Sequence, residues 1–446
     1  MDTVKLNYRH TILIGFAFFS ICSFWQMYNS VIPLILTNTF SMNETLSGVI
    51  MAADNVLALF LLPLFGNFSD CCRSRLGRRR PYVLFGTLAA VVLMLFLPVL
   101  DDSYAAAPSA HKLTLFICVL GCLLVAMGTY RSPAVALMPD VTPKPLRSKA
   151  NAVINLMGAL GGISYLIIAS VLYSSKRTAG MTHVSYMLLF IIVACIMLAA
   201  LAVLMLAVDE PKLADEAKAY EAQHPEENLT VKDETGKETL PPEVKKSLAF
   251  LLLSIALWFI GYNAIETWFT TYASRMWGMS LGGASVCLTV ATIGAILSYL
   301  PSGMVASRIG RKKTILGGVA VLACCFAAAF VYTCFAKAFH PGLYVLFALV
   351  GVAWAFINVN SLPMVVEMCR GSEVGKFTGY YYTFSMAAQT ITPIVAGALL
   401  NRVGYMTLFP YAGIFVALSF ATMCCVRHGD NRVETKKGLE AFDVDN

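Results

Sequence analysis

The chain has 446 residues, of which 58% are hydrophobic and only 13% are charged. Ordinary soluble domains carry roughly 25% charged residues, so this composition excludes a soluble protein. The net charge of +7 does not indicate nucleic-acid binding, because the basic residues are distributed among the short segments between apolar runs.

Twelve apolar runs are each long enough to cross a hydrocarbon core about 30 Å thick as a helix. The first run starts after Arg9 and has no small-residue cleavage site, so we expect a retained helix rather than a signal peptide. The sequence predicts an all-α membrane protein with twelve transmembrane helices, at 11–38, 45–68, 82–100, 113–139, 149–174, 184–208, 247–273, 281–306, 314–336, 341–367, 376–400 and 404–426.

A hydrophilic stretch, 209–246, separates six runs from the other six. It is rich in acidic residues and lysine, and is predicted to be a partly disordered linker with a short helix around Ala214–Ala222. The expected organisation is an N-terminal six-helix bundle at 1–208, a cytoplasmic linker at 209–246, a C-terminal six-helix bundle at 247–430 and a cytoplasmic tail at 431–446.

Most of the 33 lysines and arginines lie in alternate loops, in the hydrophilic stretch and at the two ends of the chain. Cytoplasmic loops of membrane proteins carry an excess of these residues. The pattern therefore predicts that both termini and the linker are cytoplasmic, in a multi-pass protein of the plasma membrane.

A short basic motif occurs twice, as GNFSDCCRSRLGRRRP from Gly66 to Pro81 and as GMVASRIGRKK from Gly303 to Lys313. Each copy lies between two apolar runs, which indicates a tight turn and a duplicated membrane half. The residues assigned to a gating motif are Gly66, Asp70, Arg75, Gly77, Arg78, Gly303, Arg308, Gly310 and Arg311.

The two copies are predicted to act unequally. Asp70 is expected to accept hydrogen bonds from N–H groups at the start of a neighbouring helix. The arginines are expected to bind anionic lipid headgroups or carboxylates of the other half. Because Ser307 occupies the place of an acid in the second copy, the C-terminal half is predicted to lack the matching gate contact.

Three charged residues lie well inside the runs: Asp54, Arg131 and Glu266. A central Asp or Arg costs ~2.5–3.5 kcal/mol on insertion scales, so each should face a partner or a water-filled cavity. Two interpretations stay open for Asp54. It is either half of a structural ion pair with Arg131 or a carrier of a proton or monovalent cation.

Polar and aromatic residues alternate along the seventh run. Asn263, Glu266 and Thr270 are spaced three and four apart and so share one helix face. Together with Tyr262 and Trp268 they suit a sugar, which needs hydroxyl partners and a flat apolar surface. The alternative is a set of hydrogen bonds between helices.

The first and tenth runs carry similar mixtures. The residues concerned are Trp25, Gln26 and Asn29 in the first run, and Trp354, Asn358 and Asn360 in the tenth. Glycines in the fifth run, Gly158, Gly161 and Gly162, are expected to permit close helix packing rather than to contact a ligand.

Nothing in the sequence predicts an enzyme, a cofactor or a metal centre. The chain has no nucleophile elbow, no His-Glu-x-x-His and no nucleotide-binding loop. The 13 cysteines include no Cys-x-x-Cys pair and are expected to be small hydrophobes. The six histidines, His183 among them, lie at run ends or in loops and are expected to be solvated.

These motifs resemble the major facilitator superfamily along nearly the whole chain. Within it, the chain is similar to the sucrose-transporter-like branch, which is related to glycoside–cation symporters. The residues that carry this narrower resemblance are Ser69-Asp70, Ser74-Arg75-Leu76-Gly77-Arg78-Arg79-Arg80-Pro81, Tyr130-Arg131-Ser132-Pro133-Ala134 and Asp140-Val141-Thr142-Pro143. The resemblance implies alternating access by the rocking of two bundles around a central site.

In that fold the first, fourth, seventh and tenth helices line the cavity. The resemblance therefore implies substrate binding by Gln26, Asn29, Arg131, Asn263, Glu266 and Asn358. Ion coupling is assigned to Asp54 and Glu266 as a hypothesis from their position. The leading hypothesis is a monomeric symporter of a sugar or glycoside with a proton or monovalent cation. The alternatives are a proton-driven exporter of drugs or metabolites and a non-transporting sensor on the same fold.

Overall fold

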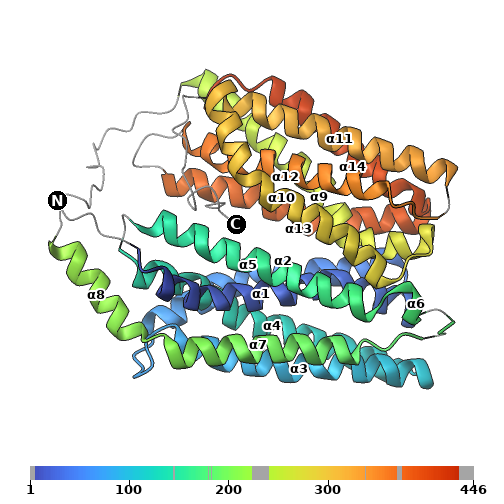
Figure 1. The fold of residues 1–446 in the computed structure, drawn as a ribbon, viewed down its shortest axis with the longest axis horizontal. Helices are drawn as coiled ribbons and strands as arrows, with labels where there is room; N and C mark the ends of the chain where they lie inside the picture. Colours follow the sequence, from blue (N-terminus) through green and yellow to red (C-terminus); the bar gives the residue numbers. More distant parts are fainter. Residues whose placement is uncertain are drawn as a thin grey trace. The chain divides into compact units, whose positions relative to one another are not determined.

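The computed structural model describes residues 6–143, 146–178, 180–181, 183–223, 241–336, 338–368 and 374–430. For 148–149, 175, 221–223 and 374–376 it describes the backbone alone. Within these residues, twelve helices are long and apolar enough to cross a membrane, which confirms the predicted all-α class (Figure 1).

The first half of the chain supplies six long helices and two shorter ones. The long helices are α1 (Tyr8–Leu34), which continues as the π-helix η1 (Ile35–Thr39), α2 (Glu44–Cys71), α3 (Arg80–Ala106), α4 (Ala110–Val141), α5 (Arg147–Leu172) and α7 (Met187–Ala207). The shorter ones are α6 (Ser175–Thr178) and α8 (Glu210–Gln223).

The second half supplies the remaining six spans. They are α9 (Pro242–Trp277), α10 (Leu281–Ile309), α11 (Arg311–Phe335), α12 (Leu343–Val366), α13 (Val374–Arg402) and α14 (Leu408–Cys424), the last preceded by the 3₁₀-helix η3 (Tyr405–Thr407). Proline starts α9 at its first position, where its missing N–H leaves no intrahelical bond unmade.

The chain forms two compact units. The first contains Met1–Met42 and Ala53–Asn228, and the second contains Asn43–Ala52 and Leu229–Asp445. The same helix packing occurs within each unit. In the first unit, α1 contacts α5 and α7, and α3 contacts α4 and α7. In the second unit, α9 contacts α13 and α14, and α11 contacts α12 and α14. This agreement shows the duplication that the two motif copies predicted.

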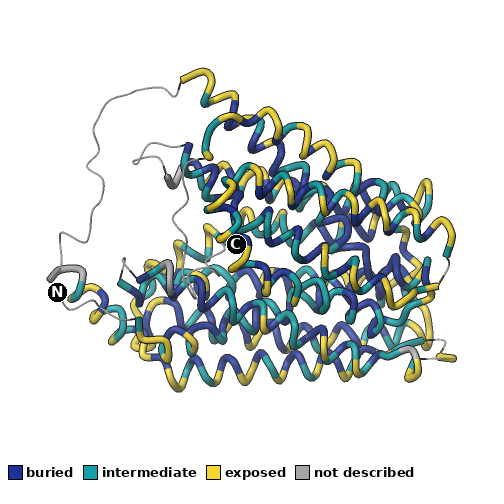
Figure 2. The backbone as a smooth tube through the Cα atoms, turned by 45° about the horizontal axis from the view of Figure 1, so that its top comes forward, coloured by how far each residue is buried: buried dark blue, intermediate teal, exposed yellow. Residues whose placement is uncertain are grey.

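Each long helix buries one face and exposes large apolar side chains on another (Figure 2). Phe60 is 70% exposed, and Leu206 and Phe335 are each 88% exposed. Such side chains suit contact with lipid tails, because burying apolar surface away from water is favourable. The burial pattern is therefore that of a multi-pass membrane protein.

Small residues let helices pack closely inside the first unit. A Cβ atom at Gly161 of α5 would lie 2.1 Å from the carbonyl oxygen of Phe19 in α1. At the same contact, Ser23 Oγ donates to the carbonyl oxygen of Gly161 at 2.8 Å. The expected packing role of the fifth-run glycines is thus confirmed at Gly161.

The hydrophilic stretch is more regular than the sequence indicated at its start. The short helix expected around Ala214–Ala222 is present as the longer α8, which begins at Glu210. At the C-terminal end of the hydrophilic stretch, α9 starts at Pro242, before the predicted start of the seventh span at 247. The predicted linker residues 224–240 and the predicted tail 431–446 lie outside the described residues.

Candidate functional site

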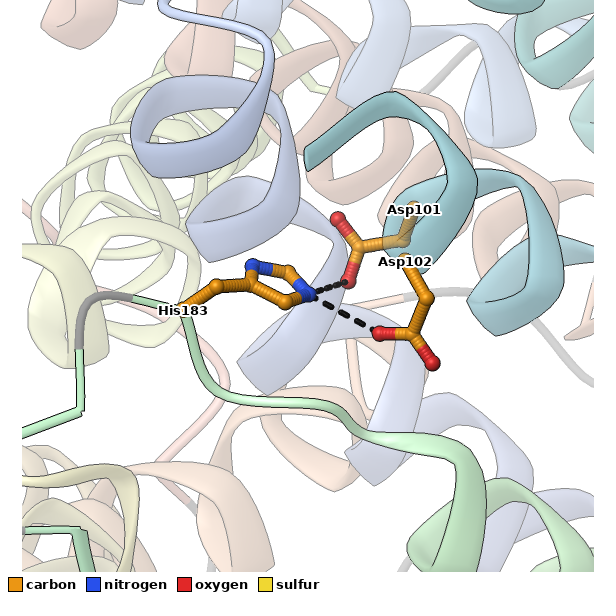
Figure 3. Close-up of side chains that lie close together, drawn as sticks. All are labelled: Asp101, Asp102 and His183. Carbon is orange, nitrogen blue, oxygen red and sulfur yellow. Dashed lines mark hydrogen bonds and ion pairs between the residues drawn. The ribbon is translucent and has the colours of Figure 1, made fainter. Parts of the chain in front are cut away.

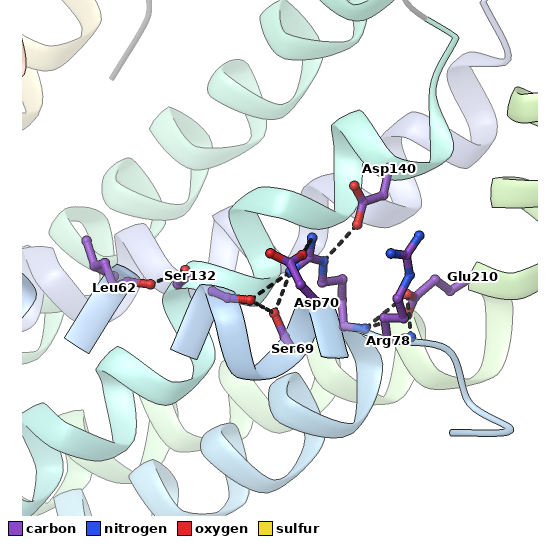
Figure 4. Close-up of polar contacts among 9 residues, drawn as sticks. Leu62, Ser69, Asp70, Arg78, Ser132, Asp140 and Glu210 are labelled. Carbon is purple, nitrogen blue, oxygen red and sulfur yellow. Dashed lines mark hydrogen bonds and ion pairs between the residues drawn. The ribbon is translucent and has the colours of Figure 1, made fainter. Parts of the chain in front are cut away.

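The first motif copy folds around the side chain of Arg79, whose partners Ser69, Asp70 and Asp140 are labelled in Figure 4. Its guanidinium Nε donates to Asp140 Oδ2 at 2.7 Å, and its other nitrogens pair with Asp70 and Ser69. Burial opposes the charge of Arg79, but the hydrogen bond and charge of Asp140, together with Asp70, raise its pKa. Arg79 is therefore a permanent cation that joins the ends of α2 and α4.

A second acid, Glu210, caps the start of α3. Its Oε1 accepts from the backbone N–H of Arg78 at 2.7 Å and of Arg79 at 3.0 Å. Its Oε2 accepts from the N–H of Arg80 at 3.0 Å. The first N–H groups of a helix have no partner within the helix and favour a negative charge, so this carboxylate satisfies two of these donors, at Arg79 and Arg80, and also the N–H of Arg78 just before them.

Gly77 makes room for this cap. Its φ of +106° lies in the region that side chains with a Cβ rarely adopt. A Cβ at Gly77 would also lie 2.3 Å from Glu210 Oε2. Glycine is thus required here both by the backbone conformation and by the approach of the carboxylate.

The other gating residues of the first copy lie around this cluster. The carbonyl oxygen of Gly66 accepts from Arg79 Nη1 at 3.3 Å. Arg75 is exposed, in the turn that the N–H of Gly77 closes on the carbonyl of Ser74 at 3.1 Å. The side chain of Arg78 is exposed too, so only its N–H takes part in the cap.

The expectation for Asp70 was wrong, and of the two kinds of partner expected for the arginines, lipid headgroups stay a prediction. Among the described residues, Asp70 accepts from no helix N–H group; Glu210 does so, and Asp70 pairs with Arg79. The carboxylate partners of Arg79 among the described residues, Asp70 and Asp140, belong to its own unit rather than to the other half. The turn therefore braces the bundle that contains it.

The second copy repeats this geometry with different residues. Arg311, at the start of α11, pairs with Glu367 at the end of α12, as Arg79 pairs with Asp140 at the end of α4. Asp430 Oδ1 accepts from the N–H of Lys312 at 3.2 Å. The C-terminal half therefore keeps the counterpart of the Arg79–Asp140 contact, whereas Ser307 makes no counterpart of the Arg79–Asp70 contact among the described residues.

The remaining positions of the second copy follow the same plan. Gly310 has φ of +94°, and a Cβ there would lie 2.8 Å from Asp430 Oδ1. Within the described part of the chain, Ser307 donates to the carbonyl of Met304 alone, at 2.8 Å. Arg308 is exposed, and a Cβ at Gly303 would meet no atom within 4 Å. The repeat thus keeps an arginine, a glycine and a capping acid, and has Ala306 and Ser307 in the places of Ser69 and Asp70.

Asp54 and Arg131, the two charged residues predicted well inside the spans of the first unit, meet at one place. Asp54, Arg131 and Trp25 line the same small cavity, and the charges of Asp54 and Arg131 interact. The Arg131 guanidinium lies 5.5 Å from the centre of the Trp25 ring, within cation–π distance. Asn55 Nδ2 donates to Asp54 Oδ1 at 3.0 Å. This half-buried group could act as an ion pair or as a proton carrier.

The two amides predicted on α1 lie near this group along the helix. Gln26 and Asn29 are both half-buried. A Cβ at Gly162 of α5 would lie 3.9 Å from Gln26 Oε1, so the Gln26 side chain lies against α5.

Glu266 lies on α9 of the second unit in different surroundings. It is half-buried, and no described residue donates a hydrogen bond to its carboxylate or pairs with it. Its charge interacts with the nearby hydroxyl of Tyr262. Asn263 is buried, and its Nδ2 has no hydrogen-bond partner among the described residues.

A stacked aromatic pair lies beside Glu266. The rings of Tyr262 and Trp354 are 3.7 Å apart between centroids and 8° from parallel, and Phe259 meets Trp354 edge-on at 5.4 Å. Trp268, predicted to offer a sugar surface, is fully buried and donates from Nε1 to the carbonyl of Pro393 at 3.2 Å. The half-buried aromatic surface beside Glu266 is therefore built with Tyr262 and Trp354 rather than with Trp268.

The amides of α12 divide into two roles. Asn360 is buried and donates from Nδ2 to Ser302 Oγ at 3.0 Å, so it joins α12 to α10. Asn358 is half-buried, and only its backbone carbonyl has a hydrogen bond with a described side chain, from Ser361 Oγ at 3.1 Å. Asn358 thus remains available to a ligand, whereas Asn360 is structural.

With twelve spans, two repeated bundles and paired basic turns described, the chain can be placed in a class. It belongs to the Major Facilitator Superfamily, whose profile matches residues 14–286 and 274–442. A solved structure of the nucleoside transporter NupG aligns with 94% of this chain and all of its own, with a TM-score of 0.66. At 13% identity, that likeness concerns the fold alone.

Among curated proteins, sugar transporters are similar to parts of this chain. Sucrose transport protein SUT3 of Oryza sativa subsp. indica is 30% identical over 151 residues, which are 31% of this chain and 30% of that protein. Proton-associated sugar transporter A of Mus musculus is 30% identical over 163 residues, 35% of this chain and 21% of its own. Each match therefore spans less than a third of the relative's length.

Sequence reasoning missed Arg79, Asp140 and Glu210 as members of the turn cluster. Asp140 was visible only as part of a family-like segment, and Glu210 only as one acid of the hydrophilic stretch. One signal was available for Glu210: it starts an acidic, helix-forming segment directly after an apolar run. Acidic residues near a run end are candidates for capping a neighbouring helix.

Proposed function

We propose that this protein is a secondary active transporter that moves a sugar or glycoside together with a proton. The observation that carries the proposal is the meeting of Asp54, Arg131 and Trp25 at one cavity inside the first bundle. Charged residues inside spans are costly and mark substrate paths and proton relays more often than they stabilise a fold.

The depth of Asp54 supports a coupling role. It is the eleventh residue of the 28-residue helix α2, about 15 Å along the helix at ~1.5 Å per residue. Protonation of Asp54 would leave Arg131 without its nearby countercharge, so proton binding and the state of Arg131 are linked. A substrate hydroxyl that contacts Arg131 would then bind differently in the two protonation states.

The second bundle would contribute the sugar surface. Sugars bind to proteins through hydroxyl groups and through their apolar ring faces. Glu266 and Asn263 supply polar groups without partners among the described residues, and Tyr262 stacked on Trp354 supplies a flat aromatic surface. With Gln26, Asn29 and Asn358, these residues form our proposed substrate contacts.

The two turns would serve alternating access. Because Arg79 and Arg311 each pair with a carboxylate of their own unit, each bundle is braced at its basic end. Rigid bundles are the condition for transport by rocking. We place this end, both termini and the segment from 209 to 246 in the cytoplasm, and the protein in the plasma membrane as a monomer.

Names of the similar proteins support the cargo and the ion. SUT3 is named a sucrose transport protein, and transporter A is named proton-associated. These names motivate sugar and proton as the first pair to test, ahead of sodium or another monovalent cation.

The test is uptake of labelled sugars into proteoliposomes under an imposed proton gradient. We expect accumulation above the outside concentration, and its collapse on addition of a protonophore. Accumulation that survives the protonophore but needs sodium would replace the proton by a cation. Purified protein can first be screened for sugars that raise its melting temperature, because a ligand that binds the folded state stabilises it.

The alternative functions give different results in the same assay. A proton-driven exporter of drugs or metabolites would extrude cargo from loaded vesicles when protons enter. A non-transporting sensor would bind a sugar in the thermal screen yet move none in either direction.

A further inference from the structure

Three side chains meet at the end of α3 that lies away from the basic turn (Figure 3). Asp101 and Asp102 belong to α3, and His183 lies in the segment that leads into α7. His183 Nε2 is 2.9 Å from Asp102 Oδ1 and 3.7 Å from Asp101 Oδ2. His183 is 27% exposed and contacts two acids, so the expectation of a solvated histidine was wrong.

Asp101 lacks the partners that a buried carboxylate needs. Its side chain is 0% exposed, and neither of its oxygens accepts a hydrogen bond of ordinary length within the described part of the chain. The side chain of Thr39 interacts with this carboxylate from beyond ordinary hydrogen-bond length, and the imidazole of His183 is likewise beyond hydrogen-bond distance. A buried charge without such partners is costly, which points to a cation held between these groups.

Neighbouring groups orient Asp102 and add no competing charge. Ser185 Oγ donates to Asp102 Oδ2 at 2.7 Å, which leaves Oδ1 directed to His183. Tyr173 donates to the carbonyl of Ser185 at 3.0 Å, and burial raises the pKa of Tyr173 to about 12. Burial also raises the pKa of Tyr186 well above its usual value, so both phenols stay neutral.

We propose that Asp101, Asp102 and His183 bind one divalent transition-metal ion of the zinc type, with water completing the coordination. The ligand atoms of the three residues all lie within 4.8 Å of one another. Around a tetrahedral Zn²⁺ with bonds of ~2.1 Å, neighbouring ligand atoms are about 3.4 Å apart. The two measured separations, 2.9 and 3.7 Å, lie on either side of that value.

The ligand types select among metals. Mg²⁺ and Ca²⁺ take oxygen ligands, so the imidazole of His183 among the three ligands disfavours both ions. Imidazole with carboxylates suits zinc and its first-row neighbours. The hydrogen bond from Ser185 matches the outer-shell partners that commonly orient metal-binding carboxylates. A bound ion would join the end of α3 to the segment before α7 at the membrane side opposite the basic turn.

The test uses the purified full-length protein, stripped of metal with EDTA and titrated with Zn²⁺ by calorimetry. We expect Asp102→Asn and His183→Gln each to lose one zinc equivalent relative to the parent protein. The matched control is His111→Gln, at an exposed histidine of α4, which should keep that equivalent. The 13 cysteines are unchanged in every variant, so their contribution cancels.

Two further measurements sharpen the result. Ser185→Ala should weaken zinc binding at least about tenfold while leaving the stoichiometry unchanged, as outer-shell changes do. Co²⁺ in place of Zn²⁺ should give visible absorption without thiolate charge transfer, because the three ligands are nitrogen and oxygen.

Equal zinc stoichiometry and affinity in the parent, Asp102→Asn and His183→Gln would overturn the proposal. The proposal is also overturned if the parent protein binds zinc through its cysteines alone, because the cluster is then only a histidine–carboxylate ion pair. A third variant, Asp101→Asn, changes a fully buried residue and is the one at risk of not folding. The zinc stoichiometry of the other two variants decides the test in that case, because Asp102 and His183 are partly exposed. The test measures zinc binding and uses no transport assay, so a negative result does not bear on the proposed transport function.

Discussion

Gly77 and the carboxylate of Glu210 lie so close together that no Cβ atom fits between them. A Cβ there would lie 2.3 Å from Oε2 and 2.4 Å from Cδ of Glu210. The acid in turn needs this approach to reach the N–H groups of Arg78, Arg79 and Arg80. One side chain from after α7 thereby fixes the start of α3.

Gly77→Ala should therefore destabilise the protein. The alanine must either adopt the unfavourable φ of +106° or move Glu210, at a cost of about 1–3 kcal/mol. The melting temperature of the detergent-solubilised protein should fall. Gly303→Ala is the matched control, because its Cβ would meet nothing within 4 Å, and it should melt like the parent. Equal melting of all three proteins would refute the tight fit.

Arg79→Gln should disrupt the end of the first bundle. The substitution removes the charge-assisted hydrogen bonds to Asp140 and Asp70. Such a bond contributes about 1.5–3 kcal/mol where solvent is excluded, and the one to the half-exposed Asp70 contributes less. Hydrogen exchange measured by mass spectrometry should speed up at the ends of α2 and α4. Arg78→Gln, one residue away and exposed, is the control and should exchange like the parent. The reverse ranking would show that Arg78 carries the contact.

Asp54→Asn tests ion coupling. The amide cannot release a proton, so uptake against a concentration gradient should fall to background while exchange of labelled for unlabelled sugar persists. Asn55→Ala removes the 3.0 Å hydrogen bond to Asp54 Oδ1 but keeps the carboxylate, so its concentrative uptake should remain. Full activity of Asp54→Asn would leave Asp54 as half of a structural pair with Arg131.

Glu266→Gln separates the two carboxylates. If Glu266 binds sugar, KM should rise and the protonophore sensitivity should be unchanged. If it carries the coupled proton, accumulation should fail as in Asp54→Asn. Unchanged affinity and unchanged coupling would remove Glu266 from the site.

Trp354→Ala should weaken substrate binding through the loss of its stacked ring. A stacked pair is worth ~0.5–1.5 kcal/mol, which corresponds to roughly a 2- to 13-fold rise in KM. Tyr262→Phe keeps the ring at 3.7 Å from Trp354 and should change KM less. If Tyr262→Phe has the larger effect, the hydroxyl rather than the aromatic surface contacts the substrate.

The spans were predictable because the length of an apolar run is a local property. Their ends were not. The third run was predicted to stop at Leu100, where the first charge follows, but α3 continues through Asp101 and Asp102 to Ala106. Helical hydrogen bonding does not end where hydropathy falls, and this difference hid the buried carboxylate of Asp101.

The composition of the turn clusters was beyond sequence reasoning for another reason. Arg78, Arg79 and Arg80 are equivalent by type, yet in the fold Arg78 is exposed, Arg79 pairs with Asp140 and Arg80 donates to the carbonyl of Met205. Its partner Asp140 is 61 positions away, and Glu210 is 131 positions away. A single sequence gives the spacing of neighbours along the chain but not which distant residues share a contact.

The cap made by Glu210 also decides where this chain can be divided. A fragment cut at the predicted bundle boundary, 1–208, would end two residues before the acid that satisfies the start of α3. Expression of two halves divided after residue 208, or deletion of the hydrophilic stretch from residue 209, would therefore remove this cap and destabilise the N-terminal bundle. A cut placed beyond Gln223 retains α8 with the bundle it caps.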